Sequence, residues 1–207
     1  MARMKFLCDT KRCIECNGCV TACKNANSEA VGWGIQRRRV VTLNDGLPGE
    51  TSISVACMHC SDAPCMAVCP ADCFSQTEDG IVQHNKDLCI GCGYCLFACP
   101  FGAPQFPKQQ AFAERGKMDK CTYCSGGPNT EPGSEKERLL YGANRIAEGK
   151  LPMCASMCST KSLLAGDAEK ISEIYSKRVA ARGAKDAGWA STAADELVMD
   201  ASKVRKA

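Results

Sequence analysis

The sequence predicts an α+β fold in which two small modules are nested, with an inserted β-hairpin and a C-terminal helical extension. Three observations lead to this prediction. Eighteen of the 207 residues are cysteines, and most of them stand in four groups of four. Short β-rich runs flank turn sequences between these groups. Two longer stretches toward the C-terminus have the apolar spacing of amphipathic helices.

The spacing within the cysteine groups is that of metal ligands. The third group, CIGCGYCLFACP, runs from Cys89 to Pro100 and has the C-x2-C-x2-C-x3-C-P spacing of bacterial ferredoxins. In that run three thiolates bind one cubane cluster, and the fourth ligates the other cluster of a pair. Disulfide frameworks suit short secreted chains, and zinc sites use two pairs of cysteines rather than triplets. We therefore predict iron–sulfur clusters in preference to disulfides or structural zinc.

The N-terminal part of the chain predicts a strand, a helix and a hairpin. Met4–Cys8 is a short apolar run typical of a strand, and a helix is expected to begin near Val20. Residues 35–43 and 51–56 are β-rich and flank the turn sequence NDGLPG. The resulting hairpin, residues 35–56, is inserted between the first and second cysteine groups.

A smaller hairpin and a capped helix are predicted farther along the chain. Residues 72–76 and 80–83 flank a Glu-Asp-Gly turn. The sequence SEKE is a capping box, and it predicts a helix over 134–149. Leu139 and Ile146 would lie on the apolar face of this helix.

The last predicted elements are a strand and an amphipathic helix. The apolar run at 163–166 is expected to be a short strand. Residues 167–182 have helical periodicity, with Ile171, Ile174 and Val179 on one side. This helix would form the first part of the C-terminal extension.

The pairing of cysteine groups divides the chain into two nested ferredoxin-like modules. Groups one and four form an outer module, residues 1–56 with 101–166, which includes the hairpin. Groups two and three form an inner module, residues 57–100, and 167–207 make a C-terminal helix and arm. Because the last cysteine of each group crosses to the paired cluster, four [4Fe–4S] clusters are expected. Their ligand sets are Cys13, Cys16, Cys19 and Cys158; Cys121, Cys124, Cys154 and Cys23; Cys57, Cys60, Cys65 and Cys99; and Cys89, Cys92, Cys95 and Cys69.

Two histidines and two further cysteines lie close to these groups in the sequence. His59 stands within the second group, and we expect it to pack against the cluster site rather than transfer protons. His84 follows a predicted strand and is expected at the surface. Cys8 and Cys73 are expected to be small buried residues rather than ligands.

Several cations also have two alternative interpretations. Lys120, Lys11 and Arg12 precede cluster ligands, and they would either raise nearby reduction potentials or be solvated surface charges. The run Arg37-Arg38-Arg39 on the inserted hairpin is either a docking site for a partner or a solvated strand face. The sequence leaves both pairs of alternatives open.

Composition and missing motifs narrow the functional class. The net charge of +3 gives no strong attraction to nucleic acid, and no apolar run is long enough to span a bilayer. The N-terminus has no apolar signal-peptide region. No acid–base, nucleophile or phosphate-binding constellation indicates substrate chemistry. The sequence therefore favours electron transfer, and a free polyferredoxin is the alternative to a subunit of a larger enzyme.

Four stretches resemble the iron–sulfur subunits of the molybdopterin (dimethyl sulfoxide reductase family) oxidoreductases. They are CDTKRCIECNGCVTACK, CMHCSDAPCMAVCP, CIGCGYCLFACPFGAP and KMDKCTYC, and the resemblance covers residues 3–166. WGIQRRRVVTLNDGLPGE and GKMDKCTYCSGGPNTEPGS are most similar to the formate dehydrogenase β subunit. Lys24 and Ser159 depart from the pattern, because they replace the proline after the last cysteine. Cys92 is retained, so the three-iron variant of some relatives is not expected.

The resemblance implies a partner and a compartment. The expected partner is a large catalytic subunit with a tungsten or molybdenum bis-pterin that oxidises formate to carbon dioxide. Electrons would pass to an acceptor such as a cytochrome subunit. Sister enzymes acting on polysulfide, nitrite or aldehydes share this electron-transfer arrangement.

Membrane-bound relatives carry a C-terminal transmembrane helix, which this sequence lacks, so no direct membrane span is expected. We expect a periplasmic location through co-export with a signal-bearing partner, with the cytoplasm as the alternative.

Overall fold

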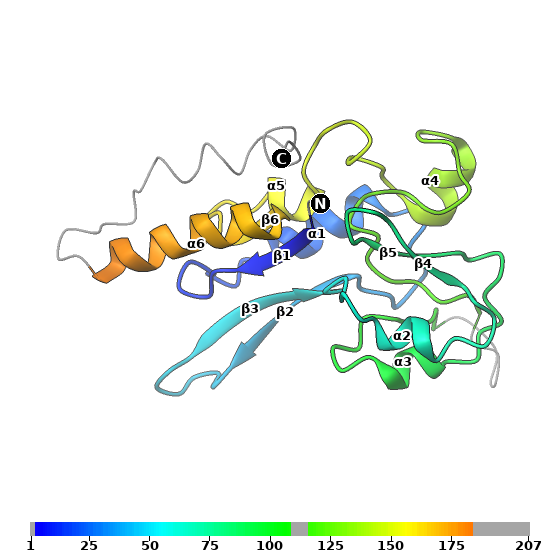
Figure 1. Cartoon of the computed structure of the whole chain (residues 1–207). Coiled ribbons are helices and arrows are strands. Elements are labelled where there is room, and N and C mark those ends of the chain that lie inside the picture. The colour runs from blue at the N-terminus through cyan, green and yellow to red at the C-terminus, as the bar shows by residue number, and fades with distance from the viewer. Residues whose placement is uncertain (1–2, 109–115, 184–207) are drawn as a thin grey trace.

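The computed structural model describes residues 3–108 and 116–183 as short helices and three two-stranded antiparallel sheets (Figure 1). This mixture agrees with the predicted α+β class. No helix of the described residues is long and apolar enough to cross a bilayer. The predicted arm at 184–207 lies outside these residues.

The first sheet joins the two ends of the described chain. Strand β1 (Met4–Cys8) pairs antiparallel with β6 (Leu163–Asp167), so that Phe6 lies opposite Ala165. Every residue of β6 is buried. Helix α6 (Ala168–Gly183) begins directly after β6 and runs beside this sheet (Figure 1). The strands predicted at both places are therefore confirmed.

Helix α6 packs on the sheet through a face that differs in part from the predicted one. Ile171 and Ile174 are buried and join Leu164 in one apolar cluster. Val179 was expected on the same side, but it is 47% exposed. Arg178 is buried instead, with Nη1 donating to the carbonyl of Lys161 at 2.7 Å. The helical period continues, but at this point of α6 an arginine is buried rather than the valine that follows it.

The inserted hairpin forms the second sheet. Strands β2 (Arg38–Leu43) and β3 (Thr51–Ala56) pair in an antiparallel register that places Arg38 opposite Ala56. Their turn extends away from the rest of the molecule (Figure 1). On β3 the buried residues alternate with partly exposed ones, so one face of the hairpin is packed against the protein.

The third sheet belongs to the middle of the chain. Strands β4 (Phe74–Gln76) and β5 (Val82–His84) form the predicted small hairpin. Two single-turn helices, α2 (Pro64–Ala67) and α3 (Tyr94–Ala98), lie beside each other below this hairpin in Figure 1. Helices α1 (Gly18–Ala26) and α5 (Met153–Ser156) pack together in the same way. Helix α1, which precedes the middle of the chain, therefore contacts α5, which follows it.

Helix α4 (Glu135–Tyr141) is shorter than the helix predicted over 134–149. Its start is as predicted, because the Ser134 hydroxyl accepts the backbone N–H of Glu137 at 3.2 Å. It ends at Gly142, which has a φ of 86° and lies so close to Asn27 that a Cβ would meet the Asn27 side chain at 2.2 Å. Leu139, expected on an apolar face, is 48% exposed. The predicted helix is thus wrong beyond Tyr141.

Candidate iron–sulfur centres

The four cysteine groups share one local geometry. In each group the third cysteine is the second residue of a short helix, and it is buried. The last cysteine of each group follows four residues later, about one helical turn along the chain. The third cysteines are Cys19, Cys65, Cys95 and Cys154. Because the backbone is alike, all four groups present their sulfurs from a loop followed by a helical turn.

Four cysteines of the middle segment surround one cavity. Three belong to the second group, and the fourth is the last cysteine of the third group; they are Cys57, Cys60, Cys65 and Cys99. The side chains of Val82 and Lys120 also line this cavity. Its four cysteines are the set predicted for one inner cluster.

A second cavity also takes its cysteines from both inner groups. It is lined by the first three cysteines of the third group and the last cysteine of the second; they are Cys89, Cys92, Cys95 and Cys69. Cys73 and Met118 complete the wall. The structure therefore brings together both predicted inner sets, with the last cysteine of each group at the other group's cavity.

The outer cysteines come together less uniformly. Cys23 and Cys154 share a buried core, and burial together with the charges of Cys154, Cys121 and Cys124 raises the pKa of Cys23. These four are one predicted set. In the other, Cys19 and Cys158 share a buried core, Cys13 and Cys158 both lie near Cys8, and Cys16 is exposed.

Backbone N–H groups point at several of the sulfurs. The N–H groups of Cys73, Ala103 and Leu163 donate to the last cysteines of three groups at 3.4–3.5 Å. Met118 N–H donates to Cys89 Sγ, and Tyr123 N–H donates to Cys121 Sγ, both at 3.4 Å. Such bonds favour the thiolate form and tune the redox properties of a cluster bound there.

Burial and hydrogen bonding act in opposite directions on these thiols. Burial raises the pKa of Cys65 and Cys121 to about 11 and that of Cys95 to about 12. At Cys158 burial is outweighed, because hydrogen bonds from Ser162, Leu163 and Thr160 lower the pKa. Iron binding must therefore displace protons from most of the buried thiols.

The donor set fits iron–sulfur clusters. Cysteine thiolates are soft ligands, and four of them around one cavity are the ligand set of a [4Fe–4S] cubane. In residues 3–108 and 116–183, no three His, Cys, Asp or Glu side chains meet at a point suited to one metal ion. Instead, each inner set of four cysteines lines a cavity.

The two remaining cysteines lie beside the quartets. Cys73 is buried as predicted, and burial raises its pKa to about 12. Cys8 is only half-buried; its sulfur accepts the N–H of Ser54 at 3.4 Å, and burial raises its pKa to about 11. Both thiols are held in the neutral form.

Both histidines are buried and neutral. His59 is 0% exposed, its Nδ1 accepts the N–H of Val82 at 3.1 Å, and its ring meets Tyr123 edge-on at 5.4 Å. Burial lowers the pKa of His59, in agreement with a packing role. The surface position predicted for His84 is wrong, because His84 is 1% exposed and burial lowers its pKa to about 4.

Asp119 forms the centre of a buried ionic network. Its carboxylate receives two bonds from Arg37, at 2.7 and 2.6 Å, and one from the ammonium of Lys86 at 2.9 Å. Burial opposes ionisation, but the charge and hydrogen bonds of Arg37, with His84 and Lys86, hold the pKa of Asp119 far below its usual range. Sequence reasoning missed this network; its only signal was a lone carboxylate two residues before Cys121.

Three cations that the sequence left as possible surface charges are buried. Arg37, Arg38 and Lys120 are 5%, 2% and 0% exposed, so the solvated alternative is wrong for them, and Arg37 and Arg38 cannot form a docking surface. Arg39 remains partly exposed and donates to the carbonyl of Phe101. Of the two N-terminal cations, Lys11 is exposed and Arg12 is half-exposed.

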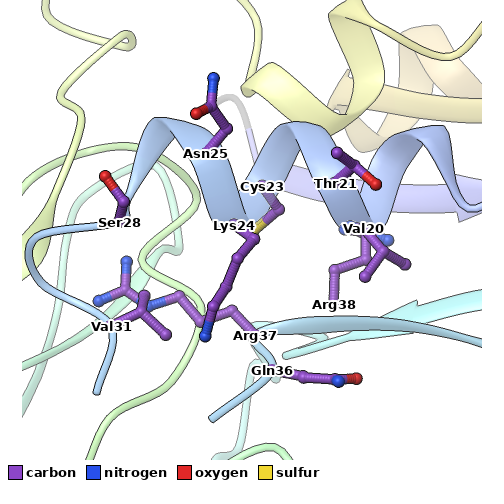
Figure 2. A pocket seen from close by; sticks show the side chains of 10 residues that line it. All are labelled: Val20, Thr21, Cys23, Lys24, Asn25, Ser28, Val31, Gln36, Arg37 and Arg38. Carbon is purple, nitrogen blue, oxygen red and sulfur yellow. The ribbon is translucent and has the colours of Figure 1, made fainter. Parts of the chain in front are cut away.

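A further cavity of about 440 Å³ lies between α1 and residues 31–38 (Figure 2). The side chain of Lys24 reaches from the helix across this space, and its Nζ donates to the carbonyl of Ile35 at 3.0 Å. Among the described residues that line it, Cys23 is the one cysteine. It is therefore not a four-cysteine cavity.

Comparisons with known proteins agree with this geometry. Residues 51–168 match the family model of the 4Fe-4S dicluster domain. The chain is 66% identical over 183 residues to the formate dehydrogenase iron-sulfur subunit of Wolinella succinogenes, across 88% of this chain and 90% of that protein. It is 34% identical over 190 residues to the thiosulfate reductase electron transfer subunit of Salmonella typhi, across 86% of this chain and 88% of that protein. A polypeptide of the anaerobic dimethyl sulfoxide reductase of Escherichia coli is 31% identical over 177 residues, across 80% of this chain and 74% of that protein.

The first two of these relatives are iron–sulfur or electron-transfer subunits of different oxidoreductases, and they match the chain over most of its length. The chain, which is similar over most of its length to a formate dehydrogenase iron–sulfur subunit, therefore belongs to the family of 4Fe-4S electron-transfer subunits of molybdopterin oxidoreductases.

Proposed function

We propose that this chain carries four [4Fe–4S] clusters and conducts electrons from a formate-oxidising catalytic subunit to an acceptor. The observation that carries the proposal is the grouping of cysteines from two separate motifs around each inner cavity. The ligand sets are those derived from the sequence, in which each group contributes its last cysteine to the paired cluster. The proposal includes two nested ferredoxin-like modules. The outer module is residues 1–56 with 101–166, and the inner module is residues 57–100.

The chain's own residues would hold the clusters and set their environment. When bound, the clusters supply one-electron transfer. The buried thiols bind iron as thiolates, the backbone N–H groups stabilise the sulfurs, and the apolar cores exclude water from them. Cys16 is exposed, so the set of Cys13, Cys16, Cys19 and Cys158 has a ligand at the surface. That set is a proposed entry or exit point for electrons.

The proposed partner is a large subunit with a tungsten or molybdenum bis-pterin that oxidises formate to carbon dioxide. The support is the 66% identity to a formate dehydrogenase iron–sulfur subunit. A cytochrome subunit is the proposed acceptor. The 34% identity to a thiosulfate reductase electron-transfer subunit supports a second candidate function, which is electron transfer in a sister molybdopterin enzyme. The proposed compartment is the periplasm, reached with a signal-bearing partner, and cell fractionation would distinguish it from the cytoplasm.

Purification of the native complex through a tag on this chain tests the proposal. We expect a large pterin-containing subunit, formate-dependent dye reduction, and about sixteen irons in this chain, four for each of four cubanes. A pterin partner without formate activity would move the substrate to a sister enzyme. Recovery of the chain without any large subunit would contradict the subunit role and favour a free polyferredoxin.

Lys120 is expected to raise the reduction potential of the inner centre held by Cys57, Cys60, Cys65 and Cys99. Its side chain lines that cavity, and its charge acts to lower the pKa of Cys65 against the effect of burial. Lys120→Gln should lower this potential by on the order of 60 mV, a tenfold change in the reduced fraction. Redox titration followed by electron paramagnetic resonance measures the shift. Lys11→Gln, which removes an exposed cation, should leave this potential unchanged.

A further inference from the structure

Arg38 is a buried cation without a carboxylate partner in the part of the chain that the structure describes. It is 2% exposed, and its guanidinium lies 4.3 Å from the centre of the Phe6 ring. The neighbouring Arg37 is paired with Asp119, whereas no such ion pair balances Arg38 in residues 3–108 and 116–183. A buried guanidinium is costly unless a negative group compensates it. The compensation must therefore come from a different kind of group.

The groups around Arg38 are cysteine sulfurs of both outer ligand sets. Burial acts to lower the pKa of Arg38, but Cys154, Cys121, Cys23 and Cys19 together raise it above its usual value. The first three belong to one proposed outer centre, and Cys19 belongs to the other. Arg38 also lowers the pKa of Cys154, against burial. The geometry agrees, because Arg38 and Cys23 line the same cavity. The guanidinium is thus near cysteines of both outer sets.

The hydrogen bonds of Arg38 are only partly used within the protein. Nη1 donates to the Ser54 hydroxyl at 3.0 Å, and the guanidinium has one bond to the Cys154 thiol. The buried Nε and Nη2 have no oxygen or nitrogen acceptor among the described residues. Arg38 lies opposite Ala56 on the hairpin, so Ser54 is its diagonal neighbour on the same face. Unused, buried donors beside cysteine ligands indicate an anionic group between them.

Ser54 extends this contact to the first ligand set. Its Oγ lies 3.3 Å from Cys19 Sγ. An arginine only donates, so the Ser54 oxygen accepts from Arg38 and its single hydroxyl hydrogen is free for the cysteine. A thiolate only accepts, and the direction of the bond is therefore Arg38 to Ser54 to Cys19.

We propose that Arg38 and Ser54 are positioning residues that raise the reduction potentials of the outer centres, with Arg38 acting on both and Ser54 on the Cys19 centre. Reduction of either centre adds one electron from the catalytic partner without making or breaking a bond. The added negative charge is stabilised by the nearby cation and by the hydroxyl bond to sulfur. The inserted hairpin thereby tunes the electron path in addition to covering it. This inference rests on the ligand sets of the proposed function.

Redox titration of the whole complex, followed by electron paramagnetic resonance, tests the inference. The two outer signals are assigned by their loss in Cys16→Ala and Cys124→Ala. At the wild-type midpoint potentials, Arg38→Gln should show at least a tenfold smaller reduced-to-oxidised ratio at both centres, which corresponds to about 59 mV. Ser54→Ala should lower the reduction potential of only one outer centre, the one that Cys19 helps to hold. Arg38→Lys should restore most of the lost potential, because lysine keeps the positive charge. The restoration should be incomplete, because lysine lacks the planar fork of N–H donors.

The matched control is Arg39→Gln, which removes the same charge from the next residue of β2, on the opposite face of the strand. It should leave both outer potentials unchanged. Equal shifts in Arg38→Gln and Arg39→Gln would overturn the role of Arg38. If Arg38→Gln loses iron, the Ser54→Ala variant decides the test. A Ser54→Ala protein with full iron content and an unchanged reduction potential at the Cys19 centre would overturn the inference. A wild-type chain with fewer than four clusters would instead overturn the ligand sets and the proposed function.

Discussion

Replacing Asp119 with asparagine is expected to lower the free energy of unfolding by about 3–5 kcal/mol, because it leaves buried cations without their counter-charge. Arg37 and Lys86 both bind this carboxylate, and each is largely buried. Arg37 also donates to the carbonyl of Tyr141 at 2.8 Å, so the network ties the inserted hairpin to the segment around α4. The loss should therefore loosen the contact between distant parts of the chain.

Anaerobic urea unfolding of the cluster-loaded protein measures this effect as a lower midpoint at similar slope. Glu148→Gln is the control, since it removes a carboxylate from the exposed ion pair with Lys150 and should not shift the midpoint. Asp119→Asn with the wild-type midpoint would show that the network contributes nothing to stability.

The same network predicts a pH dependence. The pKa of Asp119 is lower in the folded state, so its contribution is present above the unfolded pKa of about 3.9 and is lost as pH falls below that value toward the folded pKa. Wild-type stability should therefore fall more steeply than that of Asp119→Asn below about pH 4. Parallel curves for the two proteins would contradict this assignment.

Replacing Cys158 with alanine is expected to abolish the cluster of the first cysteine group rather than the cluster of its own group. Cys158 Sγ accepts from Ser162 and Leu163 at 3.4–3.5 Å, and its buried core holds Cys19 and Cys23 of the first group as well as Cys154 of its own. With crossed ligands, the variant should lose about four of about sixteen irons and the corresponding paramagnetic signal. Electron flow from the partner should fall to near zero if this centre is the entry point.

Two further variants make this test decisive. Cys16→Ala should remove the same signal as Cys158→Ala, whereas Cys124→Ala should remove a different one. Cys73→Ala is the matched control, because Cys73 is a buried cysteine outside every proposed set, and it should retain all signals and all iron. Loss of one shared signal in Cys158→Ala and Cys124→Ala would mean that the ligands do not cross.

Features that depend on local spacing can be read from the amino-acid sequence alone. The cysteine groups predicted 4Fe-4S binding, which the family match supports. Short β-rich runs and turn residues predict the strands at 4–8 and 163–166 and both hairpins, and the structure has strands at these places. These features are readable because a turn, a strand or a ligand loop is specified by residues that lie next to one another in the chain.

Which charged side chains are buried depends on contacts between segments that lie far apart in the chain. Arg37, Arg38 and His84 lie in segments that resemble solvated strands, and their burial depends on distant partners such as Asp119 and Ser54. Similarly, α4 ends at Gly142 because Asn27, from another part of the chain, occupies the adjacent space. A charged residue is placed in the interior only when folding brings a compensating group to it. That group lies far away in the sequence, so its effect is visible only in the folded chain.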